Sequence, residues 1–106
     1  MSSTQRGQNT IVEKGAKIGE NCTLGHNVVI HSDVIIEDNV TVGDNTVLGK
    51  GPFRANTSAT TSIEALPALV IGRDSTIGAS CVIYKGVAMG EKCFVGDLAT
   101  IREKTR

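Results

Sequence analysis

The sequence predicts an all-β fold in which the chain winds as a parallel solenoid of triangular coils. An aliphatic residue recurs every six positions from Ile18 to Leu48, and a small or β-branched residue stands four places after most of them. Gly, Asn or Asp fills most of the fourth places of these hexads, and these residue types tolerate the positive φ of a tight corner. A period of six fits neither a helix nor a hairpin, so a repeated coil explains it best.

The hexads fall into two runs that a loop separates. Residues 1–11 are a polar lead-in, either frayed or a first partial strand, and one β-helix domain spans residues 12–106. Seven hexads precede the loop and six follow it. The loop, residues 54–70, breaks the period with turn-forming residues and a Leu66-Pro67 step that cannot continue a hydrogen-bonded ladder.

Each coil of this solenoid is expected to contain three hexads. The fifth place, the sixth place and the next first place form a short strand, with the fifth and first residues facing inward and the sixth facing outward. Residues should therefore stack at intervals of 18 before the loop and 35 across it, about 4.8 Å apart along the axis. The chain is long enough for about four triangular coils.

Composition excludes several classes of protein. The chain has 106 residues, 3% aromatic residues and no Trp, which suits a narrow interior. Its 11 basic and 11 acidic residues are interspersed and cancel, so no surface for nucleic acid or an anionic membrane is expected. The start lacks an apolar signal region, and no run approaches the roughly 18 apolar residues of a membrane span. We therefore expect a cytoplasmic protein with a small-molecule or protein partner.

The three cysteines are expected to be small, buried and reduced. Cys22, Cys81 and Cys93 have neither CxxC nor CxxH spacing, and each stands at the fifth place of its hexad. That place otherwise holds Val, Thr, Ala or Ser, so packing explains these cysteines better than nucleophilic chemistry or metal binding.

The thirteen hexads resemble those of the hexapeptide-repeat acyltransferases. Three segments are similar to bacterial sugar N-acetyltransferases: ALPALVIG at 65–72, VIYKGVAMG at 82–90 and GDLATIRE at 96–103. The resemblance implies a left-handed parallel β-helix and a homotrimer. It also implies a metal-free transfer of an acetyl group from acetyl-CoA to an amino group on a nucleotide-linked sugar, in a cleft between subunits. Such relatives continue for several more coils, so the resemblance leads us to expect that the chain corresponds to an N-terminal portion of such an enzyme.

Acetyl transfer to an amine needs a general base, and two histidines are present, His26 and His31. The stacking interval places Asp44 one coil beyond His26, where a carboxylate can hold the imidazole in one tautomer. His26 with Asp44 is therefore the better candidate for the catalytic base, and His31 is the other. A solvated corner histidine beside a solvated aspartate is the structural alternative.

Binding residues are expected in and beside the loop. Arg54 suits a phosphate group, and Asn56 suits sugar hydroxyls. Tyr84 stacks in the column of His31 and is the third candidate for substrate binding. Alternatively, the loop clamps a neighbouring subunit through its apolar residues.

Two further classes remain open. GHNVVIHSD, with His26 and His31, also resembles the zinc-binding segment of γ-class carbonic anhydrases, but the chain has only two histidines and a catalytic zinc usually takes three protein ligands. The second class is a non-catalytic or truncated β-helix segment that only assembles, since open β-sheet ends invite stacking. The acceptor sugar and the acyl group cannot be read from the sequence.

Outward-facing sixth places favour association. They are apolar where a monomer would prefer polar residues, and contiguous exposed apolar stripes usually mark an interface. One face carries Val29, Val47 and Val82, and another carries Ile35, Phe53 and Ala88.

Overall fold

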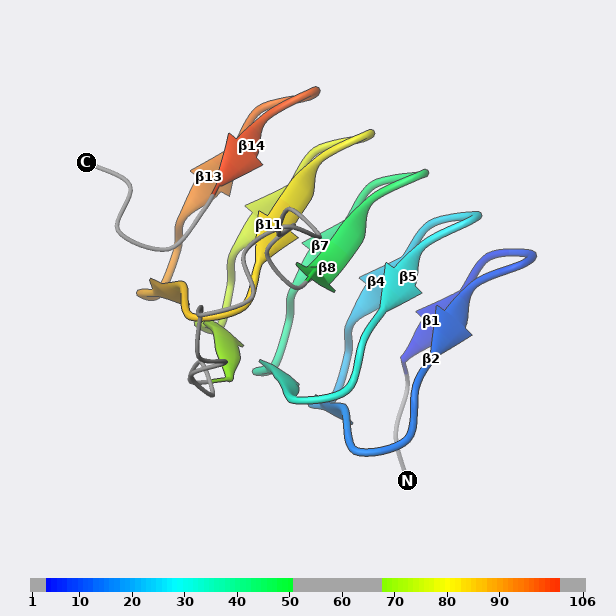
Figure 1. Ribbon diagram of the computed structural model, residues 1–106, viewed down its shortest axis with the longest axis horizontal. Helices are drawn as coiled ribbons and strands as arrows, with labels where there is room; N and C mark the ends of the chain where they lie inside the picture. The colour runs from blue at the N-terminus through cyan, green and yellow to red at the C-terminus, as the bar shows by residue number, and fades with distance from the viewer. Residues whose placement is uncertain (1–3, 51–67, 102–106) are drawn as a thin grey trace, which may run out of the picture.

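The computed structural model describes residues 4–50 and 68–101, and these form a left-handed parallel β-helix (Figure 1). This part of the chain holds fourteen short strands and no helix. Three parallel sheets make the sides of a triangular coil. The first twelve strands make four coils of three strands each, and β13 and β14 begin a fifth coil. No helix that is long and apolar enough to cross a membrane occurs in the described ranges. The fold expected from the sequence is confirmed.

Each sheet collects every third strand of the chain. The first sheet contains β1 (Gln5–Arg6), β4 (Thr23–Leu24), β7 (Thr41–Val42), β10 (Thr76–Ile77) and β13 (Phe94–Val95). The second contains β2 (Ile11–Val12), β5 (Val29–Ile30), β8 (Val47–Lys50), β11 (Val82–Tyr84) and β14 (Thr100–Ile101). The third contains β3 (Lys17–Ile18), β6 (Val34–Ile36), β9 (Leu69–Ile71) and β12 (Ala88–Met89).

The strand register follows the two predicted intervals. Thr41 aligns with Thr23, 18 residues earlier, and with Thr76, 35 residues later. The end of the loop differs from the expected span 54–70, because β9 begins at Leu69. Leu69 aligns with Val34, which gives it an inward-facing fifth place in the coil.

The corners adopt the conformation that their residue types predict. All described fourth places of the hexads have positive φ, from 58° at Ser80 and Lys92 to 97° at Gly15. Asn9 also has positive φ, at 61°. A further hexad therefore begins at Arg6 within the lead-in. Sequence reasoning missed this hexad because its first place holds Arg6 instead of an aliphatic residue.

The interior is filled by the first and fifth places of the hexads. Its largest fully buried side chains include Ile30, Ile36, Leu48, Ile71 and Ile83. Buried polar groups in these columns have hydrogen-bond partners, as their burial requires. The Thr46 hydroxyl donates to the carbonyl of Gly78 at 2.8 Å and accepts from the backbone N–H of Cys81 at 3.3 Å.

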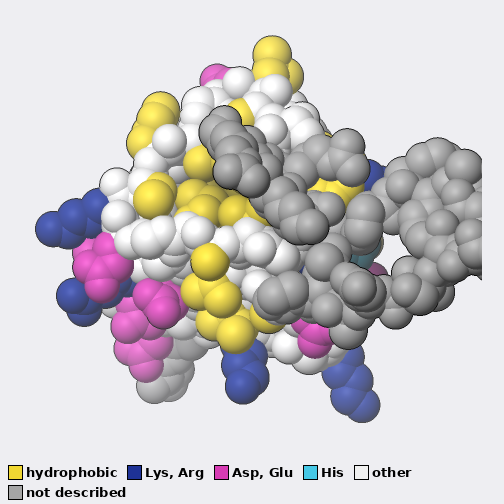
Figure 2. Space-filling view, turned by 60° about the vertical axis from the view of Figure 1, so that its left-hand side comes forward, with side chains coloured by type: hydrophobic (Ala, Val, Ile, Leu, Met, Phe, Trp, Pro, Cys, Tyr) yellow, Lys and Arg dark blue, Asp and Glu magenta, His cyan; other side chains and the backbone are white. Residues whose placement is uncertain are grey.

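Two of the three outer faces carry apolar rows along the axis. The valine row of the second sheet consists of Ile11, Val29, Val47 and Val82, aligned strand by strand. The isoleucine row of the third sheet consists of Ile35, Val70 and Ala88. Val70 takes the place expected for Phe53, which lies outside the described residues. Figure 2 shows hydrophobic side chains exposed on one face, with charged side chains at its margins.

Candidate functional site

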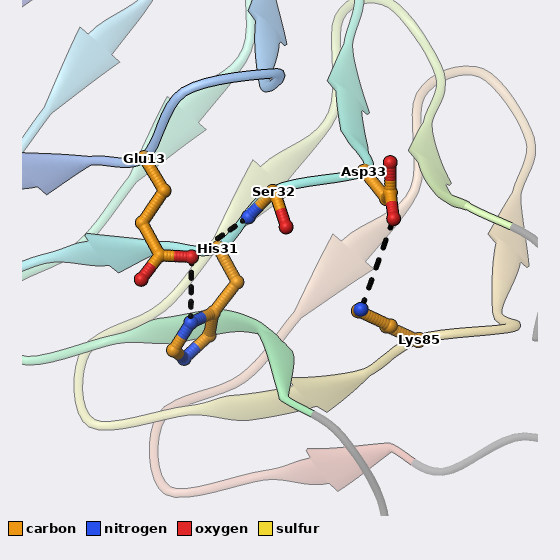
Figure 3. A network of polar contacts seen from close by, with 5 residues as sticks. All are labelled: Glu13, His31, Ser32, Asp33 and Lys85. Carbon is orange, nitrogen blue, oxygen red and sulfur yellow. Dashed lines mark hydrogen bonds and ion pairs between the residues drawn. The ribbon is translucent and has the colours of Figure 1, made fainter. Parts of the chain in front are cut away.

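A histidine–carboxylate pair lies at the corner between the second and third sheets (Figure 3). Glu13 directly follows β2, and His31 follows β5 one coil later. Glu13 Oε1 lies 3.2 Å from His31 Nδ1, and the same oxygen accepts a hydrogen bond of 3.0 Å from the backbone N–H of Ser32. One carboxylate oxygen therefore fixes both the histidine ring and the backbone of the corner.

Hydrogen bonds keep Glu13 ionised. The pKa of Glu13 is lowered from its ordinary value of 4.5, chiefly by the backbone N–H of Ser32 and then by the hydrogen bond with His31. An ionised carboxylate only accepts hydrogen bonds, so Nδ1 of His31 carries the proton that is shared with Glu13. In the neutral ring, Nε2 then holds the lone pair. Figure 3 shows Nε2 pointing away from Glu13.

The same corner holds a second charged pair. Lys85 Nζ lies 3.9 Å from Asp33 Oδ2, and the side chains of Lys85 and Asp33 are 28% and 68% exposed. Electrostatic attraction from His31 and Lys85 also lowers the pKa of Glu13, less strongly than the two hydrogen bonds do. The corner thus combines two cationic or ionisable nitrogen groups with two carboxylates, one of them held in place by hydrogen bonds.

A β-bulge adjoins this corner. Leu48 pairs with Ile83, but the register shifts at the next step, so that Tyr84 pairs with Lys50 and Gly49 is the extra residue. Gly49 is buried with φ of 83°, and a Cβ there would collide with a Val34 methyl group. The intervals of 18 and 35 residues place Tyr84 over Gly49 in the column of His31, and this expected alignment is wrong by one residue. Bulges of this kind redirect side chains and often lie beside functional sites.

The structure separates the two histidines and gives His26 a different contact from the expected one. The Nδ1 atom of His26 accepts a hydrogen bond from the backbone N–H of Gln8 at 2.6 Å. Asp44 Oδ1 accepts from the backbone N–H of His26 at 2.8 Å instead of contacting the ring. The catalytic role of His26 and Asp44 stays a prediction, but the expected contact between carboxylate and imidazole is not formed.

His26 and Asp44 belong to a repeated corner contact. Asp38 likewise accepts from the backbone N–H of Glu20, and Asp97 accepts from that of Ala79, each at 2.9 Å. In all four cases a third-place side chain reaches back one coil and caps a corner N–H group. This shared geometry gives His26 and Asp44 a structural function.

Sequence reasoning missed Glu13, although a signal for it was present. Glu13 precedes His31 by 18 residues, which is the coil interval. Following the interval from His31 only toward later coils leads to Gly49 and Tyr84 and overlooks the earlier coil. The structure thus pairs His31, and not His26, with a carboxylate.

The candidate residues for substrate binding are only partly described by the structure. Arg54 and Asn56 lie outside the described residues, and Tyr84 is half-buried at the end of β11. The cysteine prediction is confirmed for Cys22 and Cys81, which are buried free thiols.

The zinc-binding alternative concerns His26 and His31. Within residues 4–50 and 68–101, no group of three His, Cys, Asp or Glu side chains is placed to hold a metal ion. His26 and His31 contact different partners at different corners. The zinc alternative, in which a metal would bridge subunits, stays a prediction.

Comparison with protein-family models gives a match over almost the whole chain. Residues 6–105 match the family model of the GMPPB C-terminal domain, a left-handed β-helix-like domain of nucleotidyltransferases. The chain therefore belongs to the GMPPB C-terminal domain family. Comparison with curated individual proteins finds no match. This family match confirms the β-helix that the resemblance implied. The matched region begins at Arg6, where the structure places the additional hexad.

Proposed function

We propose that the chain is an acetyl-CoA-dependent acyltransferase that acetylates the amino group of a nucleotide-linked amino sugar, with His31 as the general base. The observation that carries this proposal is the Glu13–His31 pair, in which a fixed carboxylate orients the ring and directs Nε2 away from itself. Resemblance of the hexads to acyltransferases supports the reaction class. The three free cysteines suit a reducing compartment, so we place the protein in the cytoplasm.

The reaction requires one proton acceptor. The acceptor amine attacks the thioester carbonyl of acetyl-CoA, which forms a C–N bond and, after collapse of the tetrahedral intermediate, breaks the C–S bond. Nε2 of His31 removes the proton that the nitrogen loses, and the proton passes to the departing thiolate of coenzyme A. Glu13 stabilises the imidazolium formed in between, because its carboxylate accepts from Nδ1 in both states.

Assembly of three copies completes the proposed site. The corner that carries His31 lies between the valine row and the isoleucine row, the two apolar faces of the coil. Packing of these rows against neighbouring copies places the corner beside another subunit. The acceptor and acetyl-CoA then bind in the cleft between subunits, with Tyr84, Arg54 and Asn56 as the other candidate contacts.

A thiol-release assay tests the proposal. Wild-type protein is incubated with acetyl-CoA and a panel of nucleotide-linked amino sugars, and free coenzyme A is measured. His31→Asn should lower kcat by about 100-fold or more, the usual contribution of a general base. His26→Asn retains an acceptor for the Gln8 N–H and should keep most of the activity. Full activity of His31→Asn, or loss only in His26→Asn, would refute the assignment of the base.

A second function is supported by the family match. A non-catalytic assembly domain fits a family described as a C-terminal domain, and the two apolar rows give it surfaces to assemble with. In this case the wild-type chain forms a stable oligomer in sedimentation experiments but releases no thiol with any amino-sugar nucleotide. Thiol release that depends on His31 excludes it.

A further inference from the structure

Lys85 lies at the same corner as His31 but takes no part in the proton transfer proposed above. Its side chain is only 28% exposed, which is low for a lysine of a narrow solenoid. Among the described residues, Asp33 is the one side-chain ion-pair partner of its ammonium group. A lysine whose side chain is only 28% exposed, at the same corner as the proposed base, is better explained by a functional role than by solubility alone.

Asp33 does not hold Lys85 firmly. Their 3.9 Å separation exceeds the length of a hydrogen bond, and Asp33 is 68% exposed. Exposed ion pairs of this kind contribute little, because water and salt screen them. An ammonium group carries three donors, and this ion pair engages none of them in a hydrogen bond. A stronger anion can therefore displace Asp33 at small cost.

Backbone contacts at the end of β11 hold the main chain of Lys85 in one position. The β-bulge at Gly49 of β8 pairs Tyr84 with Lys50 instead of Gly49, and the N–H of Lys85 donates to the carbonyl of Lys50 at 3.0 Å. Gly86 follows with φ of 89° and turns the chain. The bulge changes the residue on β8 that the end of β11 meets, and the hydrogen bond to Lys50 fixes where the backbone of Lys85 leaves the coil.

We propose that Lys85 binds a phosphate group of the acceptor, so that the site takes phosphate-bearing amino sugars in preference to free ones. This inference rests on the acyltransferase function proposed above. The acceptor has a neutral reacting amine for His31 and an anionic part that needs a cation. Lysine supplies a compact point charge suited to phosphate. Phosphate takes the place of the Asp33 carboxylate on the ammonium group.

Enzyme kinetics with two acceptors test the role of Lys85. A UDP-linked amino sugar is compared with the same sugar lacking UDP, in wild type, Lys85→Ala, Lys85→Arg and Asp33→Asn. Lys85→Ala should raise KM for the UDP-linked sugar about tenfold more than KM for the free sugar, as expected for a lost charged contact. Lys85→Arg should restore most of the difference. Asp33→Asn should lower KM for the UDP-linked sugar, since the competing carboxylate is gone.

Equal changes of KM for both acceptors would overturn the inference, because they would indicate a structural role for Lys85. A binding measurement separates this failure from failure of the proposed function. UDP is titrated into each variant by calorimetry, without acetyl-CoA. Weaker binding to Lys85→Ala supports the phosphate contact, even where no thiol is released and the acyltransferase proposal fails. Identical UDP affinity of wild type and Lys85→Ala refutes the contact, even where acetyl transfer is intact.

Discussion

Asp44 Oδ1 accepts a hydrogen bond from the backbone N–H of His26, 2.8 Å away in the preceding coil. Corner N–H groups of this kind are left over by the strand ladders, so an acceptor on the next coil satisfies them. Asp44→Ala should therefore lower the free energy of unfolding by about 1 kcal/mol, the usual contribution of one such bond. Asp44→Asn keeps an acceptor oxygen and should recover most of it. Chemical denaturation measures both variants, and an unchanged Asp44→Ala protein would contradict the assignment.

The period of six residues allowed prediction of the strands, their register and the corners. It constrains the first, fourth and fifth places, where packing or positive φ leaves few alternatives. Leu24, Val42 and Ile77 stack in one inward column at the intervals read from the sequence. These features depend on backbone periodicity alone, and the structure confirms them.

The candidate site was less predictable, because it depends on the direction of side chains at unconstrained places. Asp44 and Glu13 are both carboxylates one coil from a histidine, but Asp44 reaches the backbone while Glu13 reaches the ring. Side-chain length differs between Asp and Glu, and periodicity says nothing about it. The bulge at Gly49, which pairs Tyr84 with Lys50, is a local departure from the period, and the period could not predict it either.

Close stacking of the coils makes Gly25 necessary. A Cβ at Gly25 would collide with Asp44 Oδ1 and lie 2.8 Å from the backbone nitrogen of Asp44. Gly25→Ala should therefore reduce the free energy of unfolding by roughly 1–3 kcal/mol, as overpacking does. Gly96 holds the same place in its hexad with no described atom within 4 Å of an added Cβ, so it is the matched control.

Gly96→Ala should leave the stability unchanged or raise it by about 0.5 kcal/mol, because alanine reduces the entropy of the unfolded chain. Thermal unfolding followed by circular dichroism compares the stability of both variants with that of the wild type. Similar losses in the two variants would show that the cost arises from the backbone and not from the neighbouring coil.

Leu98 is the least suitable residue among the described corners. Its φ is 65°, a conformation that costs an ordinary L-residue roughly 1–2 kcal/mol, and its side chain is 78% exposed. Leu98→Asn should therefore raise the free energy of unfolding by about 1 kcal/mol, since Asn tolerates this conformation. Leu98→Ala also removes the exposed side chain but keeps the conformational cost. Equal gains from Asn and Ala in urea denaturation would attribute the effect to surface apolarity instead of backbone strain.

Glu13 gives the fold a dependence on pH in the acid range. Its pKa is lowered in the folded state, first by the N–H of Ser32 and then by the hydrogen bond with His31. Its stabilising contribution is therefore complete above its ordinary pKa of 4.5 and is lost as the pH falls through the lower folded-state value. Glu13→Gln keeps an acceptor oxygen but does not titrate.

The difference in unfolding free energy between wild type and Glu13→Gln should shrink as the pH falls below 4.5. Urea titrations at stepped pH values measure this difference. A difference that grows as the pH falls below 4.5 would show that the ionised carboxylate is less stable in the folded state than in the unfolded one, opposite to the observed contacts.

The valine row provides a test of assembly with a matched control on another face. Val47 is an outward sixth-place residue of the second sheet, and Thr41 holds the same place on the first sheet, where Thr23 and Thr76 flank it. Val47→Lys puts a charge into the proposed contact between copies and should convert a trimer to monomers in sedimentation velocity experiments, because burying an unpaired charge is costly. Thr41→Lys introduces the same charge on a polar face and should leave the trimer intact. A wild-type monomer would show that the valine row forms no contact between copies. Dissociation by Thr41→Lys alone would place the interface on the first sheet. Either outcome would leave the corner of His31 exposed to solvent.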